Sequence, residues 1–157
     1  MKTLDKINRH ILNILQENSS ITNAELAYKI GLAPASTLER VKKLEKNGII
    51  KRYVAIVDEK KIGKGTVVFA IINMKEHSVE TIRDFNNFVQ DLPEVLECHR
   101  LAGDKDYILK IVTEDIRSYE AFSIEKLSKV PGIARVITSF VLSSPKDHTK
   151  IPIPEEP

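Results

Sequence analysis

Apolar residues recur at helical spacing in three segments of the first fifty residues. The first segment ends in the polar run 18–20. The second opens with a capping box, in which Thr22 caps the amide of Glu25 and Glu25 reaches back, and it ends at Gly31. The third covers 34–47 and opens with a proline, which the first turn of a helix tolerates. The positions expected to face the core are Leu4, Ile7, Ile11, Leu12, Leu15, Leu26, Ala27, Ile30, Leu38, Val41 and Leu44.

A different pattern follows the polar, glycine-containing segment 58–65, where we expect a domain boundary. Strand-like segments cover 66–74, 95–102, 107–112 and 133–142, and helix-like segments cover 79–92 and 118–130. The order βαββαβ predicts a ferredoxin-like domain, so the chain belongs to the α+β class. We therefore divide the sequence into 1–63, which is helical with a linker strand after Gly48, and 64–157.

The first strand of the second domain is apolar on both faces. One face carries Val67, Phe69 and Ile71, and the other carries Val68, Ala70 and Ile72. Helices cover one face of such a sheet, and the second apolar face also needs a cover. The simplest cover is the same sheet of a second copy, which predicts a homodimer. An acid at Val68 or Phe69 is expected to disrupt it.

Charge is distributed unevenly, although the net charge of the whole chain is only +2. Residues 1–63 carry 12 Lys and Arg against 7 Asp and Glu, a net charge of +5, whereas 64–157 carry 12 against 15, a net charge of −3. A basic first domain suits a polyanionic partner. The single cysteine, Cys98, and a longest apolar run of six residues predict a cytoplasmic chain without disulfides or membrane spans.

Two short helices joined at a glycine are typical of a helix-turn-helix. Small residues at the start of the third helix would fit the major groove, where Ser36 and Thr37 could read bases, while Arg40 and Lys43 neutralise phosphates. Because Leu38 is the next apolar position, the turn is predicted to be one residue longer than in the tightest version. The alternative is a three-helix bundle whose third helix is basic by coincidence.

The sequence contains no recognisable motif for enzyme catalysis. Cys98 and His99 are neighbours in a strand, so their side chains point to opposite faces and cannot share a metal ion. The Asp104-x-Asp106 pair lacks the other oxygen ligands of a calcium loop. No glycine-rich phosphate loop or G-x-S-x-G elbow occurs. We expect no enzymatic activity and no cofactor or metal.

Several motifs in combination resemble the Lrp/AsnC (feast/famine) transcriptional regulators. They are LDKINRHIL at 4–12, ELA at 25–27, GLAP at 31–34, ERVKKLEKNGII at 39–50, AGDKDYIL at 102–109, VPGI at 130–133 and TSFVL at 138–142. The resemblance implies a winged helix-turn-helix, a linker strand and a βαββαβ domain often called RAM. It also implies dimers that assemble toward octamers, DNA wrapping, and an amino acid or related metabolite bound between dimers.

Carried over position by position, the resemblance implies two sets of site residues. The DNA-contacting set, with the cations after the third helix added, is Pro34, Ala35, Ser36, Thr37, Glu39, Arg40, Lys43, Lys51 and Arg52. The effector-binding set is Leu101, Gly103, Asp104, Asp106, Thr138 and Ser139. Among these, Asp106 is expected to transmit the effector response. Two departures from the family are Ala33, where many members place a serine N-cap, and Lys105, where an aromatic or uncharged residue is common.

The expected function is a sequence-specific transcriptional regulator that binds double-stranded DNA and responds to an amino acid or related small metabolite through its assembly or its DNA binding. The alternative is a haem-biosynthesis decarboxylase, because some of those enzymes look like this family in both domains and act on a tetrapyrrole. The basic third helix and the charge of the first domain favour DNA.

Overall fold

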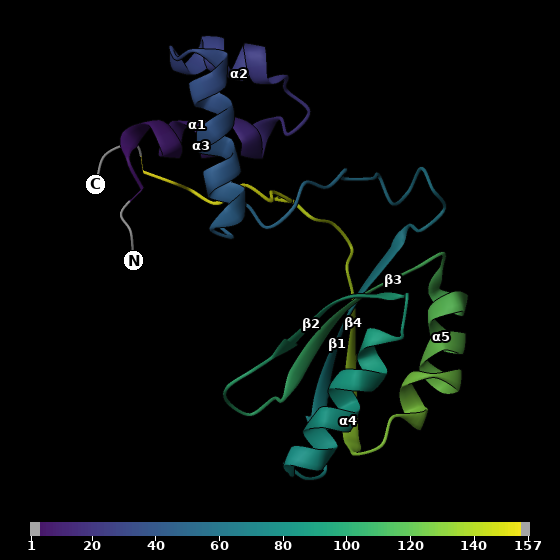
Figure 1. Cartoon of the computed structure of the whole chain (residues 1–157). Coiled ribbons are helices and arrows are strands. Elements are labelled where there is room, and N and C mark those ends of the chain that lie inside the picture. Colours follow the sequence, from purple (N-terminus) through teal and green to yellow (C-terminus); the bar gives the residue numbers. More distant parts are fainter. Residues whose placement is uncertain (1–3, 155–157) are drawn as a thin grey trace. The chain divides into compact units, whose positions relative to one another are not determined.

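The computed structural model describes residues 4–154, which form two compact units (Figure 1). The first unit contains residues up to Ile56 together with the segment from Lys146 onward, and the second covers Val57–Pro145. The predicted division into 1–63 and 64–157 therefore differs from the observed one at both ends. The C-terminal segment belongs with the first unit because its backbone carbonyls accept hydrogen bonds from side chains of the first helix, at Arg9, Asn13 and Gln16.

Three helices build the first unit. They are α1 (Lys6–Glu17), α2 (Asn23–Ile30) and α3 (Pro34–Lys46). The predicted capping box is present, since Glu25 Oε2 accepts hydrogen bonds from the amide and hydroxyl of Thr22, and Thr22 Oγ1 accepts from the Glu25 amide. Gly31 ends α2 in the left-handed conformation at φ 70°, as predicted. An unforeseen cap is Asp5, which accepts from the Asn8 amide at the start of α1.

The core of this unit lies where the three helices meet. Its fully buried apolar residues are Ile11, Leu12, Leu26, Ala27 and Leu44. One predicted core position is wrong: Leu38 is 43% exposed, whereas Thr37 is fully buried. The Thr37 hydroxyl donates to the Ala33 carbonyl one turn earlier, which satisfies its polar atom inside the core. The turn is therefore not lengthened by a residue.

The segment after α3 is irregular between Lys51 and Asp58, and it pairs with no strand in the described part of the chain. The linker strand predicted here is absent from the single chain. The segment is anchored to α3 by the Tyr53 hydroxyl, which donates a hydrogen bond to Glu45 Oε1 at 2.9 Å. Burial and this carboxylate raise the pKa of Tyr53 to about 12, so the hydroxyl remains a donor.

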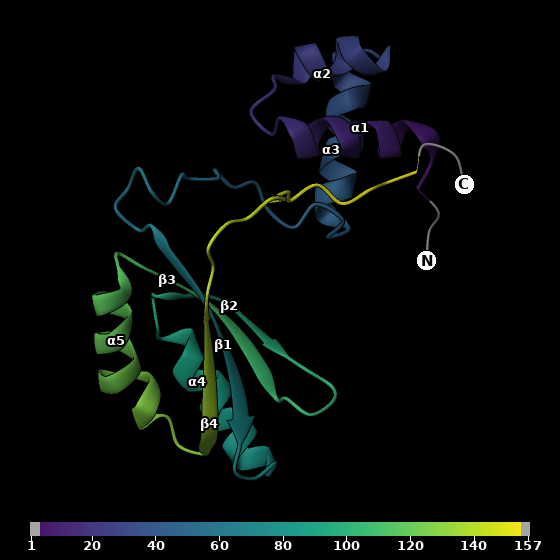
Figure 2. The same cartoon turned by 180° about the vertical axis from the view of Figure 1, so that it is seen from behind.

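The second unit has the predicted βαββαβ order. Its elements are β1 (Thr66–Met74), α4 (Val79–Gln90), β2 (Val95–Arg100), β3 (Tyr107–Thr113), α5 (Ile116–Glu125), the 3₁₀ turn η1 (Leu127–Lys129) and β4 (Ile133–Phe140). The strands form one antiparallel sheet in the order β2-β3-β1-β4, and α4 and α5 lie on the same face (Figures 1 and 2). The ferredoxin-like prediction is confirmed.

The helix predicted over 118–130 is divided in two in the structure. Asp115 caps α5 by accepting a hydrogen bond from the Ser118 amide at 2.7 Å, so the helix begins at Ile116. It ends at Glu125 and continues as the separate 3₁₀ turn η1.

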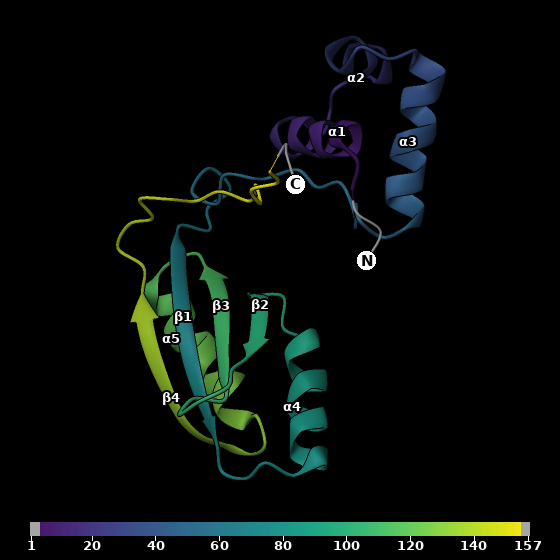
Figure 3. The same cartoon turned by 90° about the vertical axis from the view of Figure 1, so that its left-hand side faces the viewer.

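The central strand β1 has two different faces. Val68, Ala70 and Ile72 are fully buried beneath α4 and α5, whereas Phe69 is only half-buried and lies on the face without helices (Figure 3). The expectation that an acid at Val68 tests the dimer interface is therefore wrong. That substitution would place a charge in the core of the unit, and Phe69 is the informative position.

The start of α3 offers a direct test of local stability. Ala33 occupies the N-cap with φ −65° and ψ 143°, and no side chain caps the helix there. The substitution Ala33→Ser should stabilise the helical unit by about 0.5–2 kcal/mol, because a hydroxyl can accept from an amide of the first turn. Urea denaturation followed by circular dichroism measures the gain. The matched control Ala35→Ser adds the same hydroxyl inside the helix and should give no gain.

Candidate nucleic-acid interface and ligand-binding turn

The face of α3 that carries the predicted DNA contacts is largely exposed. Ala35, Ser36, Glu39 and Lys43 are all open to solvent. Glu39 and Lys43 form an ion pair of 2.7 Å one helical turn apart, and each side chain is 68% exposed. Such a pair contributes little to stability, so the lysine can exchange the carboxylate for a phosphate. The small residues at the helix start leave room for close approach to a groove.

Arg40 has a different role from Lys43. Its Nη1 lies 2.7 Å from Asp5 Oδ2 and 3.1 Å from Asn8 Oδ1, so it joins α3 to the start of α1. The hydrogen bond from Arg40 lowers the pKa of Asp5. The guanidinium side chain is only 32% exposed. Arg40 therefore positions α3, and it offers less to a phosphate than a free surface arginine would.

The turn between α2 and α3 is fixed by side chains as well as by Gly31. The Asn23 side chain donates from Nδ2 to the Pro34 carbonyl at 2.9 Å, which ties the start of α2 to the start of α3. Thr37 was predicted to read bases, but its side chain is fully buried and bonded to the Ala33 carbonyl. This residue sets the packing of α3 and is removed from the accessible DNA-contacting set.

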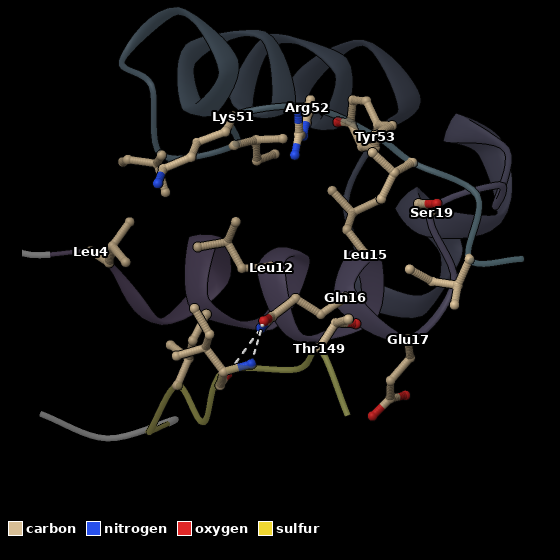
Figure 4. A pocket seen from close by; sticks show the side chains of 16 residues that line it. Leu4, Leu12, Leu15, Gln16, Glu17, Ser19, Lys51, Arg52, Tyr53 and Thr149 are labelled. Atoms are coloured by element: carbon tan, nitrogen blue, oxygen red, sulfur yellow. Dashed lines mark hydrogen bonds between the residues drawn. The ribbon is translucent and has the colours of Figure 1, made fainter. Parts of the chain in front are cut away.

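Lys51 and Arg52 are exposed cations on the irregular segment after α3. They line a groove of about 440 Å³ between this segment, α1 and the C-terminal tail (Figure 4). Apolar side chains of α1, including Leu12 and Leu15, line the same groove. The two exposed cations therefore line a groove that is partly apolar.

The predicted effector residues of the second unit begin with the turn between β2 and β3. Asp106 Oδ2 accepts a hydrogen bond from the Met74 amide at 2.7 Å, and Oδ1 lies 2.6 Å from His77 Nε2. The bond from Met74 lowers the pKa of Asp106 from its ordinary 3.8. The carboxylate therefore stabilises the turn above that pH, and its contribution is lost as pH falls through the lowered pKa.

The remainder of the turn is open and held at its backbone. Gly103 has φ 129°, a conformation that favours glycine, and among residues 4–154 no atom beyond its two chain neighbours stands within 4 Å of the place that a Cβ would take. The Asn73 side-chain amide donates to the Asp104 carbonyl at 2.8 Å, and the Leu101 amide donates to the Asp106 carbonyl. Leu101, Gly103 and Asp104 are exposed, so a small ligand could approach the turn closely.

Thr138 and Ser139 lie on opposite faces of β4. Thr138 pairs with Ala70 on the helix-covered face, and its hydroxyl is 2.7 Å from the Tyr119 hydroxyl of α5. Ser139 pairs with Phe69 on the other face. Phe69 and Asn73 are four residues apart along β1, or about 13 Å. A single chain therefore does not bring Ser139 and the turn into one small site.

Several positioning residues escaped the sequence analysis. They are Asp5, Asn8, Asn23, Asn73 and His77. Each forms a hydrogen bond to a residue distant in the sequence, so the local spacing of residues does not predict the contact. The one available signal was Asp5 directly before the first helical segment, since aspartate is a favoured N-cap.

A helix-turn-helix with an exposed basic helix and a ferredoxin-like sheet with a ligand-accessible turn define a two-domain regulator. Comparisons with known families agree. A model of the winged helix-turn-helix DNA-binding domain matches residues 4–51, and one of the Lrp/AsnC ligand binding domain matches residues 67–151. The chain belongs to the Lrp/AsnC family of transcriptional regulators, with a DNA-binding and a ligand-binding domain. The relatives found are regulators, and the decarboxylase alternative is not favoured.

Individual relatives extend over nearly the whole chain. The transcriptional regulator AzlB of Bacillus subtilis is 44% identical and covers 97% of both chains. The leucine-responsive regulatory protein of Escherichia coli K12 is 36% identical over 97% of this chain and 93% of its own. A Neisseria meningitidis regulator solved as its L-Met complex is 34% identical, with a TM-score of 0.92 and coverage of 96% and 97%. The solved structure of an AsnC family regulator from Agrobacterium tumefaciens is 38% identical, with a TM-score of 0.90, and the match covers 95% of this chain and 97% of its own.

The role of Lys43, one of the exposed lysines of α3, can be tested directly. Lys43→Ala should weaken binding to all DNA sequences about equally and reduce the slope of log affinity against log salt by about one, because one phosphate contact is lost. The control Lys129→Ala removes the same charge from an exposed position in the ligand-binding domain and should leave the slope unchanged. An unchanged slope for Lys43→Ala would exclude Lys43 from the phosphate contacts. Fluorescence anisotropy at several salt concentrations measures both variants.

Proposed function

We propose that this protein is a sequence-specific DNA-binding regulator whose assembly or DNA binding responds to an amino acid or a closely related metabolite. The proposal rests on the presence of two features in one chain. One is the exposed, basic α3, and the other is a turn in the ligand-binding domain that is open to solvent while hydrogen bonds hold its backbone and Asp106 in place. Binding alone, without catalysis, is sufficient for this role. Because such a regulator acts on the chromosome, we place it in the cytoplasm; no helix among residues 4–154 is long and apolar enough to cross a membrane.

The DNA-contacting surface that we propose consists of the exposed part of the predicted set. Its residues are Pro34, Ala35, Ser36, Glu39 and Lys43, with Lys51 and Arg52 as further candidates. Arg40 supports this surface from behind through Asp5 and Asn8. Specificity would come from Ser36 and affinity from the lysines, since hydroxyls can contact base edges and cations neutralise phosphates.

An amino-acid effector is supported by the chemistry of the turn and by the L-Met complex of the Neisseria relative. An amino acid carries an ammonium donor and a carboxylate acceptor. Asn73 Oδ1 is buried and accepts no hydrogen bond from the described residues, while Asp104 offers an exposed carboxylate nearby. Both could receive an ammonium group, and the open backbone at Gly103 could donate to a carboxylate. Thermal-shift screening of the twenty amino acids tests this, because saturation at 100 times Kd adds about 2.7 kcal/mol.

We further propose that two copies pair through the helix-free face of the sheet, and that such dimers assemble toward octamers. The face carries the half-buried Phe69 and Ile71 in its centre, flanked by Ile108 and Ile137 on the neighbouring strands. An apolar sheet face of this kind is unfavourable in water and is covered in stable proteins.

Phe69→Asp should convert the dimer into a folded monomer, because the substitution places a charge in the apolar contact while leaving the helix-covered core intact. Sedimentation velocity measures the mass, and circular dichroism confirms the fold. The conservative control Phe69→Leu should remain dimeric. Val68→Asp should lose the native fold, since Val68 is fully buried. A dimeric Phe69→Asp variant would show that this face is covered by something else.

Asp106→Asn should abolish the influence of the effector on DNA binding and leave effector-free DNA affinity within a few-fold. The substitution removes the charge but retains an oxygen that can accept from the Met74 amide. Effector coupling is typically about 1–3 kcal/mol, so its loss is measurable. The test titrates DNA selected by the protein from a random pool, with and without the amino acid found by screening. A wild-type response would mean that Asp106 only shapes the turn.

A further inference from the structure

The C-terminal segment lies along α1, whose side chains contact the backbone of the segment. The Pro154 carbonyl accepts from Arg9 Nη1 at 2.9 Å, and the Ile153 carbonyl accepts from Asn13 Nδ2 at 3.2 Å. The Gln16 side chain bonds both backbone groups of Ile151, at 2.7 Å to its N–H and 3.1 Å to its carbonyl. Lys150 forms an ion pair with Glu17. We call residues 149–154 the tail strap.

The spacing of these contacts is regular. Arg9 to Glu17 spans eight helical residues, or about 12 Å. Lys150 to Pro154 spans four residues, or about 12 Å in the extended polyproline conformation that Pro152 and Pro154 favour. Both spans agree, so the strap meets the helix at each end without bending. The two prolines have no N–H, so no donor is left unpaired at those positions.

The strap also contributes apolar contact. Ile153 is partly buried and packs against the core cluster of Ile11, Leu12, Leu26 and Leu44. Ile151 and Ile153 also line the groove that is lined by α1 and by the segment that follows α3. The tail therefore contributes the Ile153 side chain to the core of the DNA-binding domain, although it follows the last strand of the ligand-binding domain in sequence.

The helix that holds the strap also holds the DNA-contacting helix. Asp5 and Asn8, at the start of α1, bind Arg40 of α3. On the same helix, Asn13 and Gln16 bind the strap. Loosening α1 from the tail would therefore weaken the support of α3.

We propose that the α1 face formed by Arg9, Asn13, Gln16 and Glu17 is a binding site for an extended, proline-containing peptide, and that its occupant is the tail strap of the same chain. The bound strap maintains the strength of DNA binding because it holds α1 and α3 in place. The DNA-binding domain is then joined to the ligand-binding domain by two chain segments, one before β1 and one after β4. The inference goes beyond the proposed function, and its first test requires neither DNA nor effector.

Hydrogen exchange on the full chain tests the site. Gln16→Ala removes two hydrogen bonds to the strap without changing charge, and it should speed exchange of the α1 amides by about tenfold. The α4 and α5 amides should not change. The control His10→Ala alters an exposed α1 side chain that forms no hydrogen bond to the strap in the described part of the chain, and it should leave α1 protection intact. Unchanged α1 protection in Gln16→Ala would overturn the proposal.

A truncated chain ending at Pro145 gives the second arm. It should lose α1 protection, and a synthetic peptide of residues 146–154 should restore it, whereas a scrambled peptide of the same composition should not. Full α1 protection in the truncated chain, or equal rescue by the scrambled peptide, would overturn the site. Should the truncated chain fail to fold, Gln16→Ala in the intact chain decides.

DNA binding separates support of α3 from direct contact. With sheared genomic DNA as the probe, Gln16→Ala should weaken binding several-fold while leaving the salt slope unchanged, because no charge is lost. Unchanged affinity would overturn the link between strap and DNA-binding helix. Because the exchange measurement uses no DNA, a protein that binds no DNA at all would contradict the proposed function and leave the peptide site established.

Discussion

Contacts on several sides of α1 constrain the entire DNA-binding domain. One side buries Ile11 and Leu12 against α2 and α3. The N-terminal end binds Arg40, and a third side binds the tail strap through Asn13 and Gln16. A domain of three short helices has a small core, so each added contact is a sizeable part of its marginal stability. The geometry of α3 toward DNA follows from how firmly α1 is held.

The comparison of Arg40 with Lys43 shows why a basic helix cannot be read as a uniform DNA contact. Both are cations on α3, yet Arg40 is bound by Asp5 and Asn8 and Lys43 only by the exposed Glu39. Arginine can hold two oxygens at once with its planar fork, which suits it to joining two helices. The positive charge of the domain therefore divides into a structural part and a part available to phosphates.

Sequence periodicity predicted the elements that depend on local rules and failed where distant residues meet. The capping box at Thr22, the glycine after α2 and the βαββαβ order follow from propensities and spacing, and all are confirmed. Thr37 was misplaced because its hydroxyl looks polar in sequence, whereas in the helix it bonds the Ala33 carbonyl and becomes buried. The contact between the strap and α1 was not predicted, because the two segments are more than 130 residues apart and no local pattern indicates that they meet.

Within one chain, the proposed effector residues do not lie together. Ser139 lies on the helix-free face beside Phe69, whereas the turn that contains Asp106 is held at Asn73, four residues or about 13 Å farther along β1. A free amino acid is too small to touch both in one chain. If both sets of residues contact one effector, a second chain must bring its own turn or its own Ser139 to the site. Effector binding would then favour the assembled form, and assembly would raise effector affinity by the same factor.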